Sequence, residues 1–300
     1  MRKRKVNVES LWRFVFIITV LMPGTFAHGL EKDQQLLMDL QRDLMPDRLD
    51  TLLAGEREVA LLINESTTPI TRGVAVLLGE TGHSPLGYKN LAPLAELLNG
   101  YGWVTMIMTP PTTGFFNYQP VAATAVAEPT ASPAAETQSQ ADTPIHPKTG
   151  LQSFSQEDFS RHEQQLMLQL QAVVERTRQY PGFFLIIAQG TTAAWLTKLY
   201  SEKDLELPDA MVVVSPFWPD RNYNNQIPEL LAKTEFPVLD IYSPWDNEWS
   251  LETSEKRKIA AVKGLKLHYR QRELIGQALN TEQYHLLSKE IYGWLTYMGW

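Results

Sequence analysis

The residues with the most chemical meaning lie where a buried apolar run ends, between Phe183 and Thr192. The run stops at small residues and restarts as a helical pattern, which is typical of a nucleophile elbow, a sharp turn that lifts one side chain above a sheet. In such a turn a serine, with a small residue two positions away on each side, attacks a carbonyl carbon. Ala188 and Thr192 take the two small positions, and Gly190 takes the position of the serine. The sequence therefore predicts the turn without the hydroxyl that would do the chemistry.

An acyl-transfer site also needs an acid after a later strand and a histidine near the C-terminus. Asp246 follows the strand-like run 238–243, where the acid would lie, although a loop aspartate that caps the next helix is the alternative. His285 lies inside a helical pattern, which is more typical of a partly buried helix residue than of a base. Thr191 is placed to replace the missing nucleophile or simply to cap the helix that it begins.

The loop 79–85 follows another apolar run and, next to an elbow, would donate a backbone N–H to a developing oxyanion. Glu80 would repel that negative charge, which argues against ordinary ester hydrolysis. Glu80, His83 and Ser84 form a polar cluster that could bind a ligand, or supply Ser84 as a displaced nucleophile assisted by His83 or His285. A turn that satisfies its own hydrogen bonds is the alternative.

Aromatic residues follow two later strand-like runs, and open α/β sheets bind ligands at the edge where strands end. Trp218 and Trp245 would gather at this edge, where they would line an apolar pocket or cover the end of the sheet. The predicted ligand-binding residues are Glu80, His83, Gly190, Thr191, Trp218 and Trp245. The candidate catalytic residues are Thr191, Ser84, Asp246 and His285.

These residues are positioned by apolar runs that alternate with helical patterns. We expect strands at 58–63, 73–79, 103–108, 183–188, 211–215, 238–243 and 265–274, the first two joined by a hairpin-length loop. We expect helices at 88–99, 156–180, 191–200, 250–262 and 281–297, with His162 on the surface of the second. The order predicts an α/β fold with a mostly parallel sheet, helices on both faces and an N-terminal β-hairpin.

Composition narrows the function classes. A chain of 300 residues that is 44% hydrophobic can bury one large core. Its net charge of -7 weighs against nucleic-acid binding, which needs clustered Lys and Arg. The absence of cysteine excludes disulfides, thiol nucleophiles and thiolate metal sites. Since no phosphate loop, dinucleotide fingerprint or zinc spacing occurs, we expect no cofactor and no metal.

The first residues have the pattern of a signal peptide. Basic residues at 2–5 precede an apolar run at 14–22, and Thr25-Phe26-Ala27 is a plausible cleavage site. The apolar run is too short to span a bilayer, so we expect a signal at 1–27 and no stable membrane span after its cleavage. An uncleaved N-terminal anchor is the alternative. Both place the folded domain in the periplasm or otherwise outside the cytoplasm.

Three further segments follow the signal. Leucines at helical spacing predict an amphipathic lead-in at 28–50, and the main domain is expected over 51–300. A Pro/Ala/Thr-rich stretch at 119–152 interrupts this domain and has too few large apolar residues to offset the cost of ordering. We expect it to be a disordered insertion, with a functional lid as the alternative.

Several segments together resemble a family of uncharacterised exported bacterial proteins that are similar to α/β-hydrolases and known as a domain of unknown function. The matching segments are 77–85, 102–105, 188–191, 237–242, 269–274 and 291–295. The resemblance implies an α/β-hydrolase-like fold and an exported location. It implies no substrate and transfers no catalytic residue, because the elbow departs from the catalytic pattern at Gly190.

The sequence favours an exported protein of hydrolase fold that lacks hydrolase activity and binds a small molecule or a partner in the cell envelope. One alternative is an active esterase, lipase or peptidase with Thr191 or Ser84 as a displaced nucleophile. Another is a cell-envelope assembly protein that uses the insertion at 119–152 as its contact segment.

Overall fold

The computed structural model describes residues 37–40, 42, 49–82, 91–111, 156–202, 205–276 and 283–300. The predicted signal, the insertion and most of the lead-in lie outside the described residues, as do His83 and Ser84. Of the lead-in, residues 37–40 and 42 are helical. Among the described helices, none combines the length and the apolar character that crossing a bilayer requires.

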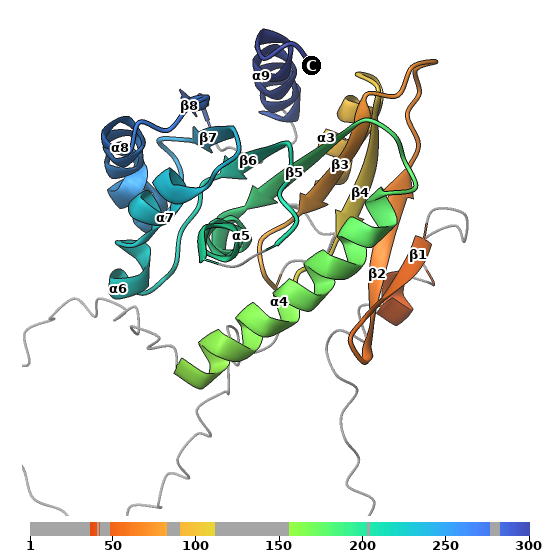
Figure 1. Cartoon of the computed structure of the whole chain (residues 1–300), viewed down its shortest axis with the longest axis horizontal. Helices are drawn as coiled ribbons and strands as arrows, with labels where there is room; N and C mark the ends of the chain where they lie inside the picture. The colour runs from red at the N-terminus through yellow and green to blue at the C-terminus, as the bar shows by residue number, and fades with distance from the viewer. Residues whose placement is uncertain are drawn as a thin grey trace, which may run out of the picture.

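The described strands form one eight-stranded sheet with the order β1-β2-β4-β3-β5-β6-β7-β8 (Figure 1). Their bounds are β1 (Leu49–Ala54), β2 (Arg57–Asn64), β3 (Gly73–Leu78), β4 (Trp103–Met108), β5 (Phe183–Gln189), β6 (Ala210–Val214), β7 (Val238–Tyr242) and β8 (Tyr269–Glu273). Strands β3 to β8 run parallel, whereas β2 is antiparallel to both β1 and β4. The predicted fold class is confirmed.

The N-terminal hairpin joins different strands from those expected. β1 pairs with β2 across a turn at Gly55, whose φ of +67° favours glycine. The expected pairing of 58–63 with 73–79 is wrong, because β4 lies between β2 and β3. The β3–helix–β4 crossover lays β4 beside β3, so that Leu61 of β2 pairs with Met108 of β4. β1 itself overlaps the segment that we expected to be the lead-in.

Helices cover both faces of the sheet (Figure 1). Their bounds are α3 (Ala92–Asn99), α4 (Gln156–Thr177), α5 (Gly190–Glu202), α6 (Arg221–Asn224), α7 (Ile227–Lys233), α8 (Glu248–Lys263) and α9 (Tyr284–Tyr297). One core cluster joins α4, α5 and α7 to one face of the sheet. A second joins α3 and α9 to the other face. The short α6 and α7, between β6 and β7, were not expected from the sequence.

The prediction of a surface histidine on α4 is wrong. His162 is fully buried, and its ring lies 4.9 Å from that of Trp195 in α5. The reason is helical spacing, because His162 lies three residues after Phe159 and four before Leu166, which are both in the core. The buried face of α4 therefore includes a polar ring.

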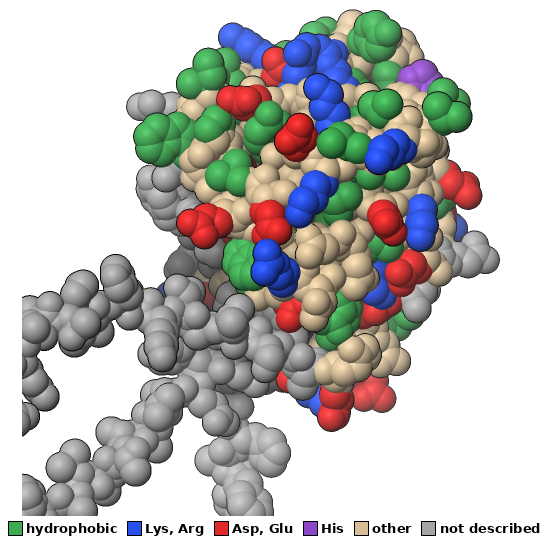
Figure 2. Space-filling view, turned by 90° about the vertical axis from the view of Figure 1, so that its left-hand side faces the viewer, with side chains coloured by type: hydrophobic (Ala, Val, Ile, Leu, Met, Phe, Trp, Pro, Cys, Tyr) green, Lys and Arg blue, Asp and Glu red, His purple; other side chains and the backbone are tan. Residues whose placement is uncertain are grey.

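The side of the molecule that carries α8 and β8 has a mixed surface. Acidic, basic and hydrophobic side chains are interspersed over this face (Figure 2). The end of α8 and the turn after it contribute the exposed hydrophobic residues Val262, Leu265 and Leu267. No single sign of charge dominates the view.

Candidate functional site

The predicted elbow is present at the end of β5. β5 ends at Gln189 and α5 begins at Gly190, whose φ of +59° lies in the left-handed region. A side chain at this position is strained, and hydrolytic enzymes accept that strain in order to expose a nucleophile. Gly190 adopts the same conformation with little strain and without presenting a reactive group.

Glu80 fills the space that a nucleophile would need. It lies in the loop after β3, the strand that pairs with β5. A Cβ atom added at Gly190 would lie 2.9 Å from Cγ, 3.0 Å from Cδ and 3.3 Å from Cβ of Glu80. These separations are shorter than ordinary carbon contacts, so a serine at this position would displace Glu80. The side chain of Glu80 thus occupies the space that the side chain of a catalytic serine at residue 190 would need.

Two threonines follow Gly190 and are both buried. The hydroxyl of Thr192 is hydrogen-bonded to that of Thr81 over 3.2 Å, which ties the elbow to the loop that carries Glu80. Thr191 is 1% exposed, and among the described residues its hydroxyl has no hydrogen-bond partner. A displaced nucleophile needs a base within hydrogen-bond reach, and the described residues place none at this hydroxyl.

Asp246 lies after β7, where the acid of a catalytic triad would be. Its Oδ2 accepts hydrogen bonds from the hydroxyl of Ser215, at 2.5 Å, and from the backbone amide of Ser243, at 2.7 Å. The N-cap residue of the next helix is Asn247, whose side chain accepts a bond from the amide of Ser250. The carboxylate therefore links the ends of β6 and β7.

Ser215 and Ser243 were not expected from the sequence as partners of Asp246. Ser215 has a φ of +51°, which is unusual for a residue with a side chain. Its bond to Asp246 is a local compensation for that conformation. The available signal was position alone, since both serines directly follow an apolar strand of the parallel sheet.

The remaining histidine candidate lies on the outside of α9. His285 is on a helix as expected, but it is exposed instead of partly buried. The neighbouring Tyr284 and Leu287 take the buried face of α9, which turns residue 285 toward solvent.

The two tryptophans do not gather as expected. Trp218 is fully buried and packs 5.7 Å from the ring of Phe159 and 5.6 Å from that of Trp195. Trp245 is 72% exposed. Trp218 therefore serves the core, which was the packing alternative, whereas Trp245 projects from the loop after β7.

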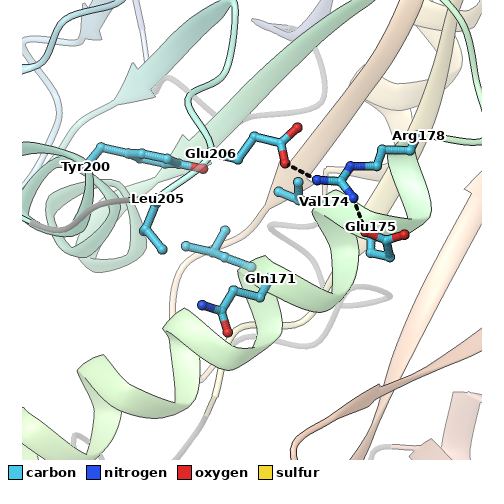
Figure 3. Close-up of a pocket in the computed structure, with 8 residues that line it drawn as sticks. Gln171, Val174, Glu175, Arg178, Tyr200, Leu205 and Glu206 are labelled. Atoms are coloured by element: carbon cyan, nitrogen blue, oxygen red, sulfur yellow. Dashed lines mark hydrogen bonds and ion pairs between the residues drawn. The ribbon is translucent and has the colours of Figure 1, made fainter.

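Two cavities lined by described residues lie away from the elbow. One of about 230 Å³ lies between the ends of α4 and α5, where Arg178 forms ion pairs with Glu175 at 2.5 Å and Glu206 at 2.6 Å (Figure 3). These helix ends lead into β5 and β6, so the cavity lies at the opposite edge of the sheet from Gly190. A larger cavity of about 670 Å³ lies between α4, the β1–β2 turn and the end of β4.

A buried ion pair joins β7, the strand beyond β6, to helix α8. Asp240 of β7 and Arg257 of α8 are both fully buried, with Oδ2 and Nε 2.8 Å apart. Tyr269 and Gln271 of β8 donate to the same oxygen at 2.7 and 2.9 Å. Burial and the charge of Asp240 raise the pKa of Tyr269. The sequence analysis gave this network no role, and it fastens β8 and α8 to β7.

Within the ranges that the structure describes, no cluster of three acidic or histidine side chains is arranged to hold a metal ion.

Several solved structures that resemble this chain are esterases or related hydrolases. An esterase domain from Rhodothermus marinus is 11% identical with a TM-score of 0.53, covering 82% of this chain and 96% of that one. A dienelactone hydrolase from Anabaena variabilis is 14% identical with a TM-score of 0.54, covering 83% and 96%. Est1E from Butyrivibrio proteoclasticus is 9% identical with a TM-score of 0.52, covering 83% and 97%. At these identities the likeness establishes the α/β-hydrolase fold alone.

A comparison with curated proteins finds no match. A family model described as a protein of unknown function (DUF3530) matches residues 27–297, which is most of the chain. The match agrees with the resemblance drawn from the sequence segments. This chain belongs to that family, and its fold is that of the α/β-hydrolases.

Proposed function

We propose that this chain is an exported protein of α/β-hydrolase fold that does not catalyse hydrolysis and that binds a small molecule or a partner in the cell envelope. The observation that carries the proposal is the contact at the elbow, where Glu80 occupies the space above Gly190. Removing the nucleophile of a triad costs roughly 10⁶-fold in rate, so the remaining groups do not support ordinary turnover.

The surroundings of the elbow support the same conclusion. A carboxylate above the turn opposes the negative charge that forms on a carbonyl oxygen during ester hydrolysis. Asp246 accepts hydrogen bonds from Ser215 and Ser243, which gives it a role in holding two strand ends together. The hydrolases of similar structure share the fold with this chain at identities too low to transfer their activities.

The exported location rests on the sequence pattern of residues 1–27. Cell fractionation and N-terminal sequencing of the mature protein test it. We expect a periplasmic protein that begins close to His28, and a protein retained in the cytoplasm with Met1 intact would contradict the proposal.

A fluorophosphonate probe tests the absence of catalysis. It labels activated serine and threonine nucleophiles covalently, and intact-mass measurement reports one adduct per active site. We expect no adduct on the folded full chain. An adduct that Thr191→Ala or Ser84→Ala removes would overturn the proposal and identify the displaced nucleophile of an active hydrolase.

The assembly alternative has a separate test. A chain lacking residues 119–152 is compared with the full chain for recovery of envelope proteins after cross-linking in cells. A partner recovered only with the full chain would support an assembly role for the insertion. The same recovery from both chains would assign the binding role to the folded domain.

A further inference from the structure

The cavity of about 670 Å³ lies at the same edge of the sheet as the elbow but over different strands. Its walls are α4, the turn between β1 and β2, and the residues that directly follow β4. The turn contacts α4 closely, since a Cβ atom added at Gly55 would lie 3.2 Å from Cδ1 of Leu168. Arg176 of α4 also forms a 2.9 Å ion pair with Asp50 of β1. These contacts hold the two walls together, so the cavity results from the packing of the folded domain.

Two buried polar side chains line this cavity without using their hydrogen-bonding groups. Thr109 and Gln169 are each 8% exposed and belong to its lining. Among the described residues, neither Oγ1 of Thr109 nor Oε1 of Gln169 has a hydrogen-bond partner. A buried polar group left unpaired costs about 1–3 kcal/mol, so native proteins normally satisfy such groups from within or with a ligand or water.

The charges around the cavity balance. Glu56 of the turn, Arg57 and Glu58 of β2, and Arg161 of α4 contribute two charges of each sign. Arg161 is also paired within its own helix, with Glu157 at 2.9 Å and Asp158 at 3.6 Å. Among the described lining residues, there is therefore no excess charge that would select an anion or a cation.

The other lining residues are mostly apolar or neutral. Leu53, Leu168, Pro110 and Pro111 supply apolar surface, and Gln164 supplies a further amide. The volume lies within the range typical of small-molecule sites, which are largely apolar with a few placed polar groups. The acceptor oxygen of Gln169 calls for an N–H or O–H donor on the ligand. The hydroxyl of Thr109 can accept from the same kind of donor, or it can donate to a ligand oxygen.

We propose that this cavity binds an uncharged small molecule that has an apolar body and a hydroxyl or amide N–H group, bonded to Gln169 and Thr109. The site gives a place and a ligand class to the binding role proposed above. The cavity does not include Gly190 or Glu80. The proposal that it binds a ligand can therefore be tested separately from the proposed loss of catalysis.

Ligand-observed NMR on the full chain tests the proposal with three neutral probes: N-acetyl-phenylalaninamide, benzamide and benzyl alcohol. The charged probes N-acetyl-phenylalanine and phenylalaninamide serve as the comparison. For probes of this size we expect a Kd of about 1 mM for the neutral compounds. Charged probes should bind at least about tenfold more weakly, because the cavity offers no net charge to replace their hydration.

Two variants separate a ligand-binding role from a structural one. Gln169→Leu and Thr109→Val each remove one unpaired polar group and keep a similar volume. Each should weaken binding of the neutral probes at least about tenfold and raise the thermal midpoint of the free protein by about 2–4 °C. Gln171→Leu makes the same change on α4 outside the cavity and should leave binding unchanged.

Three results would overturn the proposal: no neutral probe binds the full chain, binding is equal in Gln169→Leu and the unaltered chain, or both variants lower the thermal midpoint. The last result would show that the two side chains support the fold. None of these results would change the reading of the fluorophosphonate experiment, which reports on the elbow.

Discussion

The turn at Gly190 and the buried ion pair of Asp240 with Arg257 both lie where a helix meets a strand of the sheet, but they use polar groups in opposite ways. At the turn, where related folds expose a nucleophile, the side chain is absent and Glu80 covers the position. At the ion pair, one carboxylate oxygen receives three donors from α8 and β8. The most deeply buried charges of the described chain thus lie in a structural network. Here, the buried charges connect β7 to α8 and β8.

The largest effect should come from breaking the ion pair. Asp240→Ala leaves the guanidinium of Arg257 buried without its carboxylate, and we expect a loss of about 3–5 kcal/mol in the free energy of unfolding. Urea denaturation followed by circular dichroism measures the loss. Asp50→Ala breaks the more exposed ion pair with Arg176 and serves as the control, with an expected loss of under about 1 kcal/mol. Equal losses in the two variants would show that the buried ion pair stabilises the fold no more than the exposed one.

The next effect should come from restoring a side chain at the elbow. Gly190→Ser places a Cβ atom at a φ of +59° and against Glu80, and we expect a loss of about 1–3 kcal/mol. Glu80→Ala removes Cγ and Cδ, the two closest of the obstructing atoms, so the serine should cost at least about 0.5 kcal/mol less in that background. A double-mutant cycle by urea denaturation measures the coupling. The same cost in both backgrounds would show that Glu80 is not the obstacle.

The elbow and the central strands could be predicted because their signals are local. Strands β3 to β7 are apolar runs buried on both sides, and the small residues around Gly190 follow one of them directly. The burial of His162 could also have been read from the sequence, because it continues the spacing set by Phe159 and Leu166.

The pairings of side chains and strands could not be predicted in the same way. β2 pairs with β4, which follows the β3–helix–β4 crossover, and Ser215 donates to Asp246, which lies 31 residues later in the chain. The sequence contains no local mark of either contact. Trp218 and Trp245 look alike as residues after strands, and only the packing of α4 and α5 makes one buried and the other exposed. Local patterns thus predicted the position of the turn, whereas the residues and strands that contact each other around it could be identified only from the three-dimensional fold.

A smaller effect on stability is expected at Ser215, which follows β6 and donates a hydrogen bond to Asp246. Ser215→Ala removes the hydroxyl that donates to Asp246 but keeps the strain of a φ of +51°, and we expect a loss of about 1–2 kcal/mol. Ser215→Gly also removes the hydroxyl but relieves the strain, so it should be more stable than the alanine variant by about 0.5–1 kcal/mol. Urea denaturation of both variants checks this order, and the reverse order would show that the strain is unimportant.

The smallest effect is a pH dependence at the N-terminal end of β8, next to the ion-pair network. Burial lowers the pKa of Lys266 from 10.5 to about 8, while its ammonium group donates to the backbone carbonyls of Thr234 and Phe236. Between these two pKa values the unfolded chain binds more protons than the folded one, so stability rises with pH across this window and is level below it. Because Lys266 is partly exposed and solvent screens its charge, we expect a rise of only about 1 kcal/mol relative to Lys266→Met between about pH 7.5 and 10.5. Urea denaturation of the two proteins at matched pH values measures the difference. Parallel curves would show that the ammonium group is solvated in the folded state, so that Lys266 differs in this respect from the fully buried pair of Asp240 and Arg257.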